Sequence, residues 1–230
     1  MSSSMIEVSL SEGGQLNAYL STPEVEQAPG IVVVSSIYGV DSDITGIADQ
    51  LATDGFIVSA PDMFWRDAPG AIPVTEEGSK RARARGQSFD QERGMTDMAA
   101  IIENLKAHPQ CNGKMAVIGF CFGGPFAFLS AARLGIDAGL SFHGSFVGKH
   151  LAEAVNIKCP LSFHYGDQDH VASMAEIGEI KVAFDQLENA DVFIYPGLGH
   201  GYMLPSRGDG YFPAEAALSW DRAMKVLNAI

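Results

Sequence analysis

The chain has 230 residues, of which 47% are hydrophobic, and it carries a formal net charge of −13 at pH 7. This charge repels nucleic acids and anionic membranes, so neither is an expected partner. The hydrophobic fraction is typical of a globular protein with a full core, and no apolar run is long enough to cross a bilayer. The start, Met1-Ser2-Ser3-Ser4-Met5, has no basic residue or apolar stretch typical of an export signal, so we expect a cytoplasmic location.

Short aliphatic runs alternate with helical patterns along the chain. Two of these runs, Ile6–Ser9 and Leu16–Leu20, flank Gly13-Gly14, which predicts an antiparallel hairpin. Six further runs predict buried strands: Ile31–Val34, Phe56–Ser59, Met115–Gly119, Ala138–Phe142, Leu161–Tyr165 and Val192–Tyr195. Five segments with apolar spacings of three and four predict helices: Ile44–Thr53, Met95–Ala107, Pro125–Leu134, Met174–Leu187 and Ala214–Leu227. The order predicts one α/β domain over residues 1–230, with a mostly parallel sheet covered by helices on both faces.

One stretch, Met63–Gln87, is irregular. It contains several Pro and Gly residues and ends in the basic run of residues 80–85. Insertions that follow a strand in this architecture usually cover the pocket, so this segment is expected to form its roof.

The most informative segment is Gly119-Phe120-Cys121-Phe122-Gly123-Gly124, between a predicted strand and a predicted helix. G-x-C-x-G in this context is a nucleophile elbow with cysteine in place of serine. The glycines let the backbone close a tight turn, and the helix N-terminus favours a thiolate and an oxyanion. Most free cysteines are small buried hydrophobes, but a purely structural cysteine needs no such glycines. The segment therefore favours catalysis by Cys121.

Two further side chains follow the next strands. Asp169 lies after the predicted strand Leu161–Tyr165, and His200 lies after Val192–Tyr195. Enzymes with such an elbow carry nucleophile, acid and histidine in this chain order. Cys121, Asp169 and His200 are therefore the predicted triad.

The sequence resembles the dienelactone hydrolases, or carboxymethylenebutenolidases, from about Ile31 to Trp220. The matching stretches are Gly119–Gly124, Phe163–His170, Gly199-His200 and Ile37-Tyr38-Gly39. The resemblance implies an α/β-hydrolase fold, an oxyanion hole built from the backbone N–H groups of Ile37 and Phe122, and a small ester or lactone as substrate. We expect no cofactor and no metal.

In the predicted chemistry Cys121 forms a thioester with the acyl group. His200 takes the thiol proton and later activates water, while Asp169 fixes the histidine tautomer. An ordinary thiol is mostly protonated at neutral pH, so the enzyme needs either a resting ion pair with His200 or activation by bound substrate. The sequence does not choose between a resting ion pair and activation by bound substrate.

The chain departs from the family at the place of a glutamate that holds the resting thiol. That place is Ser36, and a serine hydroxyl cannot take the thiol proton. Substrate-triggered activation is therefore absent, or another acid replaces the glutamate. Asp41 and Asp43 are close in sequence, but as loop residues before a helix they are better interpreted as capping residues.

The family binds its substrate's carboxylate with two arginines, whose places here hold Ser79 and Leu204. After a small shift, Arg81 and Arg207 could take over this role. The basic run of residues 80–85 has an alternative interpretation, because charge runs usually form the solvated face of a helix.

Pocket-lining roles are also expected for a group of side chains: Ser36, Tyr38, Phe64, Trp65, His143 and Met203. The aromatic residues could instead pack beneath the insertion, and His143 could be a hydrogen-bonded histidine at a strand end. Three residues with metal-ligand chemistry, His164, Asp167 and His170, alternate along a strand and its exit loop, so they should face different ways.

Three functions remain in view. Hydrolysis of a small lactone or ester is the leading one, and a broader carboxylesterase or thioesterase without the carboxylate clamp is the second. The third is a non-catalytic binder or thiol sensor on the same fold.

The cysteines Cys111, Cys121 and Cys159 are too widely spaced for a disulfide framework or structural zinc site. A monomer or a small homo-oligomer is expected.

Overall fold

Residues 1–116 form one of the two units of the chain, and the computed structural model describes all residues from 1 to 230. β1 (Ser2–Ser9) and β2 (Gln15–Thr22) pair antiparallel around the predicted glycine turn. β2 pairs antiparallel with β4 (Ile57–Pro61), which pairs parallel with β3 (Ala28–Val34). The hairpin prediction is confirmed. Its strands extend beyond the apolar runs because most of their outer residues are polar, such as Ser2–Ser4 in β1 and Gln15, Ser21 and Thr22 in β2.

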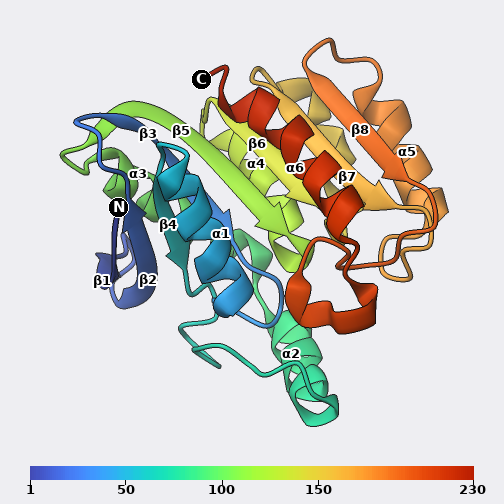
Figure 1. The fold of residues 1–230 in the computed structure, drawn as a ribbon, viewed down its shortest axis with the longest axis horizontal. Coiled ribbons are helices and arrows are strands. Elements are labelled where there is room, and N and C mark those ends of the chain that lie inside the picture. The colour runs from blue at the N-terminus through green and yellow to red at the C-terminus, as the bar shows by residue number, and fades with distance from the viewer. The chain divides into compact units, whose positions relative to one another are not determined.

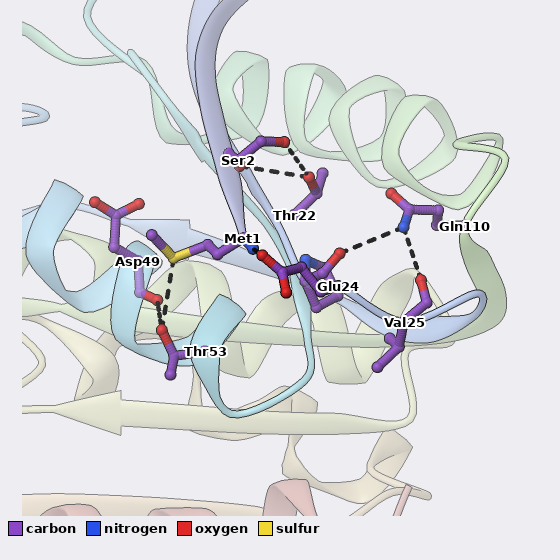
Figure 2. Close-up of polar contacts among 9 residues, drawn as sticks. Met1, Ser2, Thr22, Glu24, Val25, Asp49, Thr53 and Gln110 are labelled. Atoms are coloured by element: carbon purple, nitrogen blue, oxygen red, sulfur yellow. Dashed lines mark hydrogen bonds and ion pairs between the residues drawn. The ribbon is translucent and has the colours of Figure 1, made fainter.

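Polar contacts hold the open end of this hairpin (Figure 2). The hydroxyls of Ser2 and Thr22 lie 2.9 Å apart on paired strands, and the Met1 amino group contacts the Glu24 carboxylate at 2.6 Å. The Gln110 amide donates to the Val25 carbonyl at 2.8 Å. These contacts are exposed, so each contributes little to stability and serves mainly to fix register.

Three helices accompany these strands: α1 (Ser42–Thr53), α2 (Glu76–Ser88) and α3 (Gln91–Lys106). α1 packs against β2 and β4, while α3 packs against β1 and β3, and Figure 1 shows α1 in front of these strands and α3 behind them. The Asp41 carboxylate accepts hydrogen bonds from the backbone N–H groups of Asp43 and Ile44, so Asp41 caps α1 as predicted.

Residues 117–230 form the second unit, which β5 (Cys111–Phe120) enters from the first. β6 (Ala138–Phe142) pairs parallel with β7 (Leu161–Gly166), and β7 pairs parallel with β8 (Ala190–Tyr195). The helices are α4 (Gly124–Arg133), α5 (Met174–Phe184) and α6 (Pro213–Leu227). Figure 1 shows α6 in front of β6 and β7, and α4 behind them.

Aromatic side chains fill both sides of these strands. Phe163 of β7 contacts Phe128 of α4 and Phe184 of α5, and the three rings form one buried cluster. Phe142 of β6 stacks on Trp220 of α6, with ring centroids 5.9 Å apart. Because helices cover both faces, the strands read as continuous apolar runs, as the sequence predicted.

Several elements differ from the sequence prediction, α2 and β5 among them. α2 is a regular helix where an irregular insertion was expected, because its many charged residues conceal the apolar period. β5 begins at Cys111 instead of Met115, because its first residues alternate between half-buried and exposed positions and form no apolar run.

The helices of the structure are too short or too polar to cross a membrane. The single-domain arrangement stays a prediction.

Candidate active site

Cys121 stands at a sharp turn between β5 and α4, in the short 3₁₀ segment η1 (Cys121–Gly123). Its φ is 53°, a left-handed conformation that non-glycine residues rarely adopt. A Cβ atom at Gly119 would collide with the Gly123 carbonyl, and one at Gly124 would collide with Gly144. The turn therefore closes only because these positions lack side chains. Strain of this kind costs on the order of 1–3 kcal/mol and is typical of functional sites.

Ser145 contacts Cys121 twice. The backbone N–H of Ser145 donates to the Cys121 carbonyl at 2.9 Å, and the Ser145 hydroxyl lies 3.5 Å from Cys121 Sγ. Both residues are buried. The loop after β6 thus holds the nucleophile segment by its backbone and its sulfur.

Asp169 and His200 form a part-buried hydrogen-bonded pair. His200 Nδ1 lies 2.8 Å from Asp169 Oδ2, while the other carboxylate oxygen accepts from the backbone N–H groups of Val171 and Ala172. Burial raises the pKa of Asp169, but the contact with His200 and these two N–H groups lower it more, so the net shift is downward. The ionised carboxylate fixes a proton on Nδ1, and Nε2 is left for a second partner.

The Cys121 thiol is the second group that interacts with His200. Burial raises the thiol pKa, but the charge of His200, together with hydrogen bonding from His200, Ser145 and the Phe122 N–H, lowers the thiol pKa to about 7. Burial lowers the pKa of His200, but the Cys121 charge and the Asp169 hydrogen bond raise it to about 10. Nε2 has no hydrogen bond of ordinary geometry, so the two groups act on each other mainly through charge. The pair favours a thiolate facing an imidazolium.

His143 lies against His200, with ring centroids 4.9 Å apart in an edge-to-face arrangement. It is fully buried, its φ is 41°, and neither ring nitrogen has a hydrogen-bond partner. The sequence-based alternative of a hydrogen-bonded strand-end histidine is therefore wrong. Burial, followed by the charges of His200 and Arg207, holds the pKa of His143 well below its ordinary value. This ring stays neutral beside the imidazolium.

The Ile37 segment lies in the first unit and is held by polar contacts at both ends of one peptide. The Ser36 hydroxyl accepts from the Tyr38 N–H at 3.2 Å, and Arg85 Nε donates to the Ile37 carbonyl at 2.7 Å. Tyr38 is buried, and its hydroxyl contacts Ser79 at 2.8 Å. The oxyanion-hole role of Ile37 stays a prediction, as do the substrate-binding roles of Ser36 and Tyr38.

Arg85 is a buried cation within the basic run. Its Nη1 donates to the carbonyls of Ala68 and Gly70 at 2.7 and 2.8 Å, and its guanidinium lies 4.1 Å from the Phe64 ring centroid. The solvated-face interpretation is therefore wrong for Arg85, although Arg81 is exposed. Arg85 fastens the insertion to the Ile37 segment by bonds to backbone carbonyls.

Three further residues with predicted substrate-binding roles are Trp65, Met203 and Arg207. Trp65 Nε1 donates to Asp97 at 3.2 Å, and the Arg66 guanidinium lies over its ring, so Trp65 packs within the first unit. Met203 is buried in the second unit. The Arg207 side chain lies beside Gly201, directly after the predicted catalytic histidine, because a Cβ there would be 3.3 Å from Arg207 Cγ.

His164 makes a local hydrogen-bond network. Its ring nitrogens contact the Tyr195 and Ser162 hydroxyls at 2.9 and 3.1 Å. Burial, then the charge of Arg222, lowers the pKa of His164 to about 3, so the ring is neutral. No cluster of three or more His, Cys, Asp or Glu side chains is arranged to hold a metal ion.

Sequence reasoning missed Ser145 and Arg85. Ser145 follows the strand end Phe142-His143-Gly144, which the sequence had marked as pocket-facing, so its position was a usable signal. Arg85 gave no such signal, because an arginine among other charged helix residues is usually solvated.

Comparisons with solved structures identify the fold. A candidate dienelactone hydrolase from Klebsiella pneumoniae has the same fold, with a TM-score of 0.86 and 20% identity over 100% of both chains. A dienelactone hydrolase from Anabaena variabilis gives a TM-score of 0.72 and 20% identity over 98% of each chain. These similarities confirm the predicted α/β-hydrolase fold.

Sequence comparison identifies the family within that fold. Carboxymethylenebutenolidase 1 of Cupriavidus pinatubonensis is 32% identical over 208 residues, which are 90% of this chain and 88% of that protein. The carboxymethylenebutenolidase of Pseudomonas putida is 31% identical over 224 residues, covering 96% and 94%. The model of the dienelactone hydrolase family matches residues 16–230. The chain belongs to the dienelactone hydrolase family.

Gly119→Ala tests the geometry of the elbow. The new Cβ would meet the Gly123 carbonyl, which is backbone and cannot swing aside, so we expect a loss of about 2 kcal/mol in the free energy of unfolding. Gly178→Ala in α5 is the matched control, because nothing lies near its Cβ position, and it should stabilise the helix by up to about 1 kcal/mol. Urea unfolding of both variants gives the comparison, and equal stability would contradict the close packing at Gly119.

Proposed function

We propose that this protein hydrolyses a small lactone or carboxylic ester through a thioester on Cys121. One observation carries the proposal: Asp169 bonds His200, and His200 and Cys121 shift each other's pKa in opposite directions. A cysteine with a lowered pKa beside a raised histidine is the arrangement that nucleophilic catalysis requires. Relatives named carboxymethylenebutenolidase support the substrate class.

In the first half of the reaction the Cys121 thiolate attacks the carbonyl carbon, and the carbonyl π electrons move to oxygen. The Phe122 N–H, within η1 and next to the nucleophile, acts on the Cys121 sulfur and is the proposed donor to that oxyanion. The intermediate collapses, the carbon–oxygen bond of the ester breaks, and the leaving alkoxide takes the proton on His200 Nε2. A thioester and a neutral His200 remain.

In the second half, neutral His200 takes a proton from water, and the resulting hydroxide adds to the thioester carbon. Collapse of this intermediate breaks the carbon–sulfur bond and returns the thiolate, while the carboxylic acid releases its proton to solvent. His200 is again an imidazolium, so the resting pair is restored. Asp169 keeps the imidazole in one tautomer throughout.

The Cys121→Ala variant tests the proposal. An alanine methyl group fills part of the site without a nucleophile, so turnover of lactones and aryl esters should fall at least about 1000-fold while folding is retained. Cys159→Ala is the control, because Cys159 is also a buried thiol but burial raises its pKa to about 11. Mass spectrometry after mixing the native protein with an activated ester should find the acyl group on the peptide of Cys121. Normal turnover by Cys121→Ala would overturn the mechanism.

Arg207 is the proposed anchor for a substrate carboxylate. Its side chain lies beside Gly201, next to the catalytic histidine, and its charge reaches His143. Arg207→Met should therefore raise KM for an anionic lactone about tenfold and leave KM for a neutral aryl ester unchanged. Arg81→Met is the comparison on the exposed face of α2. Equal effects of Arg207→Met on both substrates would instead favour the broader carboxylesterase.

The pH dependence of kcat/KM for a lactone follows from the charge pair. The lowered thiol pKa means that the thiolate is present above about 7, and the raised His200 pKa means that the imidazolium is present below about 10. Because acylation needs both forms, activity should rise through the first value and fall through the second. Initial rates across this range, with the Cys121→Ala variant as background, measure the profile. A profile that starts to rise only above pH 8.5, near the pKa of a free thiol, would contradict the resting ion pair.

A further inference from the structure

Ser145 is the buried side chain that the mechanism above does not use. Its hydroxyl has one hydrogen-bond partner, Cys121 Sγ at 3.5 Å, and its backbone N–H donates to the Cys121 carbonyl. The residue is 4% exposed, so water does not readily provide a substitute partner for the hydroxyl. The two contacts join the loop after β6 to the nucleophile itself.

The direction of this hydrogen bond depends on the charge of the sulfur. A thiol could donate to the Ser145 oxygen, but the serine proton would then lack an acceptor in a buried position, which is costly. A thiolate accepts the serine proton strongly, because a hydrogen bond to an ion is stronger than one between neutral groups. The contact is therefore satisfied best when Cys121 is ionised.

Other charged and titratable groups around the sulfur act in a consistent direction. His200 faces Cys121 and is itself held by Asp169, while His143 and His170 lie against the His200 ring with centroids 4.9 and 5.9 Å away. None of these groups replaces the serine hydroxyl, because the His200 Nε2 makes no ordinary hydrogen bond to the sulfur. Ser145 is thus the one side chain with a hydrogen bond of ordinary geometry to Sγ.

We propose that Ser145 holds Cys121 as a resting thiolate by donating its hydroxyl proton to Sγ, so that the nucleophile is ionised before substrate arrives. The proton that leaves the sulfur resides on His200 Nε2, and Ser145 keeps its own. This inference deepens the proposed hydrolase function, but the state of the thiol can be measured without any hydrolysis. It also accounts for a family member in which Ser36, a group that cannot take a proton, stands where the family has a glutamate.

The test is the pH dependence of Cys121 alkylation by iodoacetamide in the resting protein. Quantifying the Cys121 peptide by mass spectrometry separates it from Cys111 and Cys159. In the native protein the midpoint should lie near pH 7. Ser145→Ala should raise it by about one pH unit, which is about a tenfold lower rate at pH 6, well below both midpoints, and Ser145→Thr should retain the native midpoint because it keeps the hydroxyl.

Ser130→Ala is the matched control. Ser130 is also fully buried, in α4, but its hydroxyl has no hydrogen-bond partner, so its removal should leave the alkylation midpoint unchanged. An unchanged midpoint in Ser145→Ala would overturn the proposal, as would an equal shift in Ser130→Ala. If the Ser145→Ala shift is found while native protein hydrolyses no ester or lactone, the role of Ser145 stands and the proposed function fails. If native protein hydrolyses an ester or lactone but Ser145→Ala does not shift the alkylation midpoint, the proposed function stands and the role of Ser145 fails.

Discussion

Electrostatic attraction between the Cys121 sulfur and the His200 imidazole is the interaction on which the candidate site depends. Cys121 is buried and the His200 side chain is 13% exposed, and an isolated charge in such a position would be unfavourable. Each becomes acceptable because the other carries the opposite charge and because further groups satisfy the pair. Asp169 bonds the imidazole, and its own second oxygen accepts two backbone N–H groups. Removing any member would leave a buried charge without its compensation.

The surroundings of this pair limit where positive charge can reside. His143 lies against His200 without any hydrogen-bond partner and is kept neutral by burial and by the neighbouring charges of His200 and Arg207. A neutral ring at this position packs against the imidazolium without repelling it. The proton of the pair is therefore favoured on His200, which bonds the Asp169 carboxylate and interacts with the Cys121 charge. With the thiol pKa lowered to about 7 and the His200 pKa raised to about 10, the two groups carry opposite charges between these two pH values.

Ser36 stands where the family resemblance would place a glutamate, and the side chain near the thiol in this chain is Ser145. Ser36 is buried and accepts the Tyr38 N–H, which makes it part of the Ile37 segment that Arg85 also holds. Its hydroxyl therefore serves the local backbone. The Ser145 hydroxyl, in the loop after β6, lies 3.5 Å from the Cys121 sulfur, and a hydroxyl can stabilise a thiolate without accepting its proton. In the role proposed for Ser145, the resting thiolate needs no carboxylate at position 36, because His200 takes the proton.

The sequence by itself determined the alternation of strands and helices, the family and the candidates Cys121, Asp169 and His200. These follow from local patterns: apolar runs, glycines around a turn, and polar residues directly after strands. The tertiary structure decided what depends on neighbours distant in sequence. Ser145 meets Cys121 across 24 positions, and Arg85 reaches Ile37 across 48, so neither contact leaves a local signature. Charge states belong to the same class, because a pKa is set by burial and nearby charges, which exist only once the chain has folded.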